Sequence, residues 1–144
     1  MTTLSTSRPM VGPFASLASL APAAHAVLRI GAGLLFMQHG FQKHLGFFGG
    51  VGPAHDTVPL LSLFGLAGVL ELAGGALIAL GLWVRPVAII LLIEMISAYF
   101  IAHLPKGGFP IENGGELALL YALVFVFLAA NGAGPASADA RRAR

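Results

Sequence analysis

The chain contains no cysteine and few charged residues. Without cysteine, it has no disulfide, no thiolate metal site and no thiol-based redox chemistry of its own. Charged residues make up 10% of the 144 positions, whereas soluble domains contain roughly 25%. Apolar residues make up 57%, and the mean hydropathy is +0.86. A soluble domain of this size leaves too much surface exposed to bury so much apolar sequence, so the composition predicts a membrane protein.

A basic stripe is also missing, although the isoelectric point is near 9.5. The eight Lys and Arg residues are scattered and do not alternate with aromatic residues. A nucleic-acid-binding surface normally needs such clustering. We therefore expect no nucleic acid partner and take the lipid bilayer as the main surroundings of the chain.

Four apolar stretches are present, at residues 23–41, 60–83, 86–104 and 115–131. Each is close to the ~20 residues that a helix needs to cross the hydrocarbon. The first is the weakest, because Arg29, Gln38 and His39 interrupt it. No alternating strand pattern is present, and a helix satisfies its own backbone in lipid. The sequence therefore predicts an all-α, integral membrane four-helix bundle at residues 23–131.

The two ends of the chain are more polar than this predicted bundle. We expect residues 1–22 to form a flexible cytoplasmic leader. A cleaved signal peptide is the alternative, because residues 10–20 are weakly apolar and residues 24–26 imitate a cleavage site. Residues 132–144 are small and polar, which predicts a disordered cytoplasmic tail.

The basic residues predict the orientation of the bundle. Four spans place both termini and the 83–86 turn on one side of the membrane. That side contains six arginines, namely Arg8, Arg29, Arg85, Arg141, Arg142 and Arg144, whereas the other contains only Lys43 and Lys106. Positive residues accumulate on the cytoplasmic side, so both termini are expected in the cytoplasm.

Two carboxyl groups lie inside the predicted spans. Glu71 and Glu94 are ten and nine residues from the 83–86 turn, roughly 14–15 Å deep. A carboxylate in lipid is costly unless it is protonated, paired or facing a polar cavity. Both are therefore candidates for proton or ligand handling. The alternative is that each is protonated and only bonds a neighbouring helix.

The first two spans each indicate which face points into the bundle. Arg29, Phe36 and Lys43 recur every seven residues and share one face of the first span. Arg29 either pairs with Glu71 or extends to cytoplasmic head groups, and both roles are open. Gly68 and Gly75 share a face with Glu71, which places this acid at a helix contact rather than toward lipid.

A second polar group is expected at the outer surface. His39 and Lys43 are near the end of the first span, His103 ends the third, and Glu116 begins the fourth. We interpret these four residues as a polar pocket for a small ligand. A metal or a haem at His39 and His103 is not expected, because neither histidine belongs to a metal-ligand spacing.

Several of these residues belong to longer motifs. The motifs are Arg29-Ile30-Gly31, HGFQK at 39–43, ELAGGALIALGLWVRP at 71–86, AYFIAHLPKGGFP at 98–110 and NGGELALLYAL at 113–123. In this order they resemble the DoxX family of small bacterial inner-membrane proteins, over about 29–128. The positions that match characteristic family residues are Gly40, Lys43, Glu71, His103 and Glu116.

The resemblance implies a four-helix bundle in the bacterial inner (plasma) membrane, linked to respiratory or oxidative-stress redox systems. The family is named after a subunit of an archaeal quinol oxidase and thiosulfate:quinone oxidoreductase system. Relatives are associated with quinone detoxification and with a membrane complex that contains superoxide dismutase. The family pattern does not say which residues are catalytic.

Three functions follow from this pattern. The first is a redox-associated subunit that binds a quinone or passes protons for a redox partner, and is not an enzyme by itself. Glu71 and Glu94 would then handle protons, and His39, Lys43 and His103 would contact a carbonyl oxygen or the partner. The second is a small proton-coupled transporter acting as a homo-oligomer. The third is an interaction scaffold without chemistry.

Overall fold

The computed structural model describes residues 15–142, and these are almost entirely helical. The α-helices are α1 (Ala21–Leu45), α2 (Leu63–Leu80), α3 (Val84–Ala98), α4 (Pro110–Asn113), α5 (Glu116–Asn131) and α6 (Ala138–Arg142). Short 3₁₀ turns cover Ala15–Leu20, Phe47–Gly49 and Leu104–Lys106, and a π-helical turn covers Tyr99–His103. Within the described range there is no strand beyond one isolated bridge. The predicted all-α class is confirmed, whereas most of the predicted leader, with Arg8, lies outside the described residues, as does Arg144.

Three of the helical segments are long and apolar enough to cross a membrane. They are Leu17–Leu45, Leu63–Leu80 and Val84–Lys106. The fourth apolar helix, α5, has 16 residues, so it is about 24 Å long and shorter than a full hydrocarbon core. Large apolar side chains cover the outside of all four helices. Such a surface would be unusual in water and is ordinary against lipid.

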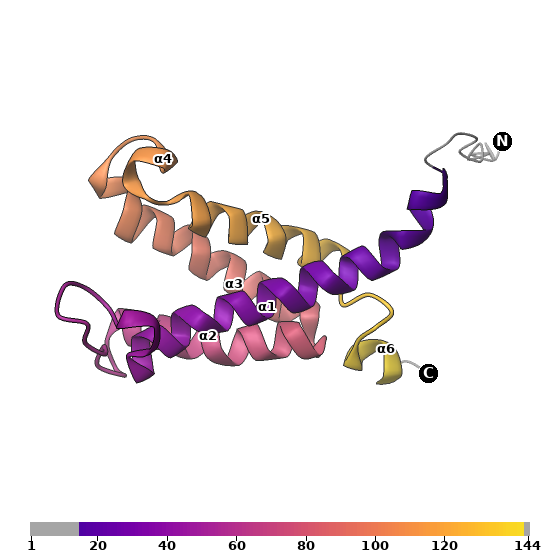
Figure 1. Ribbon diagram of the computed structural model, residues 1–144, viewed down its shortest axis with the longest axis horizontal. Coiled ribbons are helices and arrows are strands. Elements are labelled where there is room, and N and C mark those ends of the chain that lie inside the picture. The colour runs from indigo at the N-terminus through magenta and orange to yellow at the C-terminus, as the bar shows by residue number, and fades with distance from the viewer. Residues whose placement is uncertain (1–14, 143–144) are drawn as a thin grey trace.

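The four long helices are arranged as two antiparallel pairs. α1 packs most extensively against α2, and α3 against α5. Figure 1 shows the two pairs meeting near the α2–α3 turn and diverging toward the end that carries α4. The start of α1 and the short α6 both lie at the same end of the bundle as the α2–α3 turn (Figure 1).

Glycines allow α1 and α2 to touch backbone to backbone. A Cβ added to Gly33 would lie 2.6 Å from the Gly75 carbonyl oxygen, and one added to Gly40 would lie 2.6 Å from the Gly68 carbonyl oxygen. Gly33 and Gly40 are seven residues apart in α1, as are Gly68 and Gly75 in α2. Each helix therefore makes both contacts with the same face. Small residues at such contacts are a main source of helix association in lipid.

The side chains between the pairs form an aromatic and aliphatic core. Phe36 of α1 packs edge-to-face on Tyr121 and Phe125 of α5, with ring centroids 4.9 and 5.0 Å apart. Ile78 and Leu91 are fully buried beside them. Arg29 and Phe36 are fully buried, and the Lys43 side chain is only 17% exposed. This burial confirms that the face of α1 that carries the seven-residue repeat points into the bundle.

The C-terminal segment differs from the disordered tail expected from its composition. Residues 132–142 fold back on the α2–α3 turn, where the Asp139 carboxylate accepts hydrogen bonds from the backbone N–H groups of Trp83 and Val84, at 2.9 and 3.0 Å. Ser137 is buried, and its hydroxyl accepts a bond from the Ala140 N–H. The free N–H groups at the start of α3 explain the difference, because they give a carboxylate from the tail a place to bind.

Candidate functional site

A cavity of about 550 Å³ occupies the space where the two helix pairs diverge. It is lined by the second half of α1, the first half of α2, the second half of α3 with the π-helical turn, and the first half of α5. Most of its wall is apolar. The polar or charged side chains in the wall are those of His39, Lys43, Glu71, Glu94, Ser97, His103 and Tyr121.

An ion pair between Lys43 and Glu71 forms one wall of this cavity. The Lys43 ammonium donates to both carboxylate oxygens of Glu71, at 2.5 and 2.6 Å. The Glu71 side chain is 5% exposed. Side chains lean toward the N-terminus of their own helix. Because α1 and α2 are antiparallel, the Lys43 side chain leans toward the middle of the membrane, and the Glu71 side chain leans the opposite way, toward Lys43. This tilt brings together two residues that the sequence analysis had assigned to separate sites.

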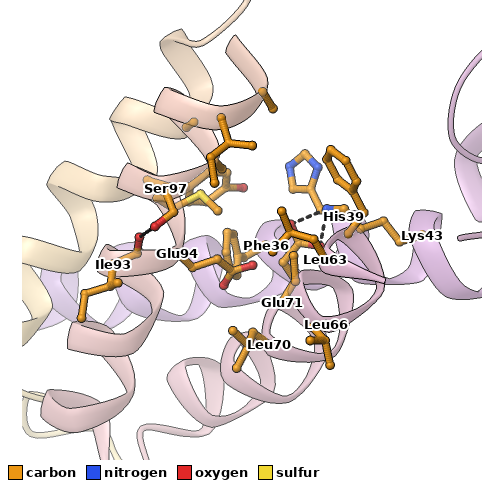
Figure 2. Close-up of a pocket in the computed structure, with 18 of the residues that line it drawn as sticks. Phe36, His39, Lys43, Leu63, Leu66, Leu70, Glu71, Ile93, Glu94 and Ser97 are labelled. Carbon is orange, nitrogen blue, oxygen red and sulfur yellow. Dashed lines mark hydrogen bonds and ion pairs between the residues drawn. The ribbon is translucent and has the colours of Figure 1, made fainter. Parts of the chain in front are cut away.

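Glu94 extends into the cavity from α3, on the opposite wall. Figure 2 shows its carboxyl group reaching toward Glu71. Both Glu94 oxygens are buried, and neither has a hydrogen-bond partner among the described residues. A buried carboxyl group normally has such partners. Glu94 is therefore an acid that faces a cavity and is left free to bind or to exchange a proton.

The aromatic and histidine side chains complete the polar lining. The His39 ring packs edge-to-face against Tyr121, with centroids 5.9 Å apart. The His103 Nδ1 atom lies 3.2 Å from the Asn113 carbonyl oxygen, at the end of the π-helical turn. Single π-helical turns inside α-helices often occur at functional sites. Two histidines of the predicted outer pocket therefore share one cavity with the two buried acids.

Arg29 lies outside this cavity and fulfils neither role that we considered for it. Its guanidinium is fully buried and donates to the carbonyl oxygens of Ile78, Ala79 and Ala136, at 2.8, 2.6 and 2.5 Å. The pairing of Arg29 with Glu71 was wrong, because the free carbonyls at the end of α2 offer a closer set of acceptors. Arg29 is a link between α2 and the C-terminal segment.

Glu116 was predicted in the pocket and does not line it. It begins α5 and is exposed, with the α5 residues Leu117, Ala118 and Tyr121 facing the cavity instead. A carboxylate in the first turn of a helix interacts favourably with the free N–H groups there.

Among residues 15–142, no group of three or more His, Asp or Glu side chains lies close enough to hold a metal ion.

Tyr121 is a site residue that the sequence analysis missed. Its hydroxyl is the only polar side-chain group between Glu116 and Asn131. A lone polar group in an apolar span is a signal of an inward-facing position. That signal was present in the sequence and would have placed Tyr121 with Glu71 and Glu94.

Comparison with known proteins identifies the family. A family model described as DoxX matches residues 24–104, more than half of the chain. The chain belongs to the DoxX family. An uncharacterized protein of Haemophilus influenzae is 44% identical over 121 residues, which cover 79% of this chain and 87% of the relative. No solved structure matches this DoxX protein.

Proposed function

We propose that this DoxX-family membrane protein is a redox-associated subunit that binds a quinone-class ligand in the cavity between the helix pairs. The observation that carries the proposal is Glu94, whose buried carboxyl group has no partner among the described residues and faces the Lys43–Glu71 ion pair. The cavity volume lies within the ~300–1,000 Å³ of small-ligand sites. A mostly apolar wall with a few polar groups is also typical of such sites.

A quinone matches this lining because it combines an apolar ring with carbonyl oxygens that only accept hydrogen bonds. The Lys43 ammonium, a protonated Glu94 and the Tyr121 hydroxyl are donors for such oxygens. Reduction of a quinone to a quinol takes up two electrons and two protons. In this proposal Glu94 and the Lys43–Glu71 pair deliver the protons, and a partner redox protein delivers the electrons.

The two alternative functions make different use of the same acids. A proton-coupled transporter would also use Glu94, as the group that is loaded and unloaded with a proton. An interaction scaffold would need the acids only as bonds between helices. The ion pair of Glu71 fits that role, whereas Glu94 has no such bond in the described chain.

Quinone binding to the full-length protein in lipid nanodiscs tests the proposal. We expect the purified protein to retain quinone on extraction and to lose it in Glu94→Leu, which removes the donor that a protonated Glu94 provides. The matched control is Glu116→Leu, because Glu116 is an exposed acid outside the cavity. Equal quinone content in all three proteins would contradict the proposal. Proton uptake into proteoliposomes that Glu94→Gln abolishes, without quinone binding, would favour the transporter.

We also propose that both termini face the cytoplasm and that the membrane is the bacterial inner membrane. The arginine distribution supports this orientation. Because the chain has no cysteine, single cysteines at Thr2 and Lys106 report on the two sides. In spheroplasts, an impermeant maleimide should label Lys106→Cys and not Thr2→Cys. The opposite labelling would contradict the orientation.

A further inference from the structure

The cavity walls continue to the lipid-facing surface of the protein. Eight large apolar residues of the wall are themselves exposed on the outside of the helices. They are Leu63, Phe64, Leu66, Leu70, Ile90, Ile93, Ile101 and Leu117. Ile93 is 61% exposed and Leu66 is 52% exposed, although both line the cavity. The cavity is therefore open between α2 and α3, toward the hydrocarbon of the bilayer.

The opening is elongated along α3. The α3 residues and those of the π-helical turn in the wall follow helical spacing from Ile90 to Ile101, a length of about 16 Å. Glu94 lies near one end of this stripe, and the Lys43–Glu71 pair faces it. Between Glu94 and Ile101 the only polar side chain in the wall is that of Ser97, and the wall ends at His103. The part of the groove beside Glu94 and the ion pair thus suits a polar ring, and the apolar part that opens toward lipid suits an apolar chain.

We infer that the ligand enters from the bilayer through the opening between α2 and α3, and that it carries an isoprenoid or alkyl chain lying along the apolar groove. This inference rests on the proposed function and adds the class of ligand, a membrane-dissolved quinone rather than a water-soluble one. The continuity of the groove with the acids is the reason for choosing this occupant. A chain held there keeps its apolar contacts while the ring reaches Glu94.

Photolabelling in nanodiscs tests the inference. The probe is a long-chain quinone with a diazirine on its chain, and labelled peptides are identified by mass spectrometry. We expect labelling of residues 63–70 and 90–101 that excess unlabelled long-chain quinone suppresses. Labelling of lipid-facing residues outside the groove, such as Leu123 on α5, should resist this competition, because Leu123 is exposed and does not line the cavity.

Two tryptophan variants separate the groove from the surface around it. Ile93→Trp fills the opening and should reduce the competed labelling at least about fivefold. Ile96→Trp adds the same ring to the same helix, away from the cavity, and should leave it unchanged. A tail-less quinone should still bind Ile93→Trp, because the polar end of the site is intact.

The outcomes distinguish failure of this inference from failure of the proposed function. Binding of the tail-less quinone with no competed labelling of the groove would overturn the inference alone. Labelling of the groove by a phospholipid with a diazirine on its acyl chain, undiminished by excess long-chain quinone, would also overturn it, because the groove would then hold an acyl chain. A protein that binds neither quinone would contradict the proposed function, and the inference would fail with it.

Discussion

The Lys43 ammonium lies 2.5 and 2.6 Å from the two carboxylate oxygens of Glu71, and this ion pair joins the last turn of α1 to the middle of α2. Both side chains are mostly buried, at 17% and 5% exposure. The pair neutralises one of the two acids in the cavity and leaves Glu94 as the acid without a hydrogen-bond partner among residues 15–142. It therefore contributes both to helix packing and to the chemistry of the site.

Removing Lys43 should destabilise the protein strongly. Lys43→Met leaves Glu71 buried without its cation, and breaking one side of a buried pair costs about 3–5 kcal/mol. Unfolding in mild detergent, followed by circular dichroism, measures the loss. The double variant Lys43→Met with Glu71→Leu should recover most of the stability. A double variant as unstable as the single one would show that the two residues are not coupled.

The glycine contact between α1 and α2 predicts opposite effects for two neighbouring substitutions. Gly33→Ala places a methyl group against the backbone of α2, near the Gly75 oxygen and the Ala79 nitrogen. We expect it to destabilise the protein by about 1–3 kcal/mol. Gly31→Ala meets no atom within 4 Å and should stabilise the helix by about 0.5–1 kcal/mol. Equal effects in thermal unfolding would argue against the backbone contact.

Arg29 should control the order of the C-terminal segment. The Arg29 guanidinium donates to the carbonyl oxygens of Ile78, Ala79 and Ala136 together. The single ammonium of Arg29→Lys cannot replace this planar, forked donor. Hydrogen exchange of residues 136–142, followed by mass spectrometry, should accelerate at least about tenfold, equivalent to about 1.4 kcal/mol. Arg141→Lys is the control, because Arg141 is exposed. Unchanged exchange in Arg29→Lys would refute the link.

Glu94 should show a conflict between stability and ligand binding. Glu94→Leu removes a buried carboxyl group that has no hydrogen-bond partner in the described chain, and we expect a gain of about 1–3 kcal/mol in the free energy of unfolding. The same variant should lose the quinone if the proposed function holds, because that function places the ligand against the Glu94 carboxyl group. A loss of stability would indicate that Glu94 has a structural partner instead.

The helical class and the inward faces of α1 and α2 were predictable from the sequence. The seven-residue repeat through Arg29 and Lys43 correctly identified the buried face of α1, and Gly68 and Gly75 correctly placed Glu71 at a helix contact. These predictions depend on helical spacing alone. The pairing of Lys43 with Glu71 was not predicted, because it depends on the tilt and register of two antiparallel helices that are 28 residues apart along the chain.

The apolar composition and the scarcity of charge determined by themselves that this chain is an α-helical membrane protein. Only the tertiary structure decided that Glu71, Glu94, His39 and His103 share one cavity, and that Arg29 and Glu116 lie outside it. The reason is that the cavity comes from the divergence of two helix pairs. That divergence depends on glycine contacts and side-chain packing between segments distant in the chain, and hydropathy along the sequence does not record it.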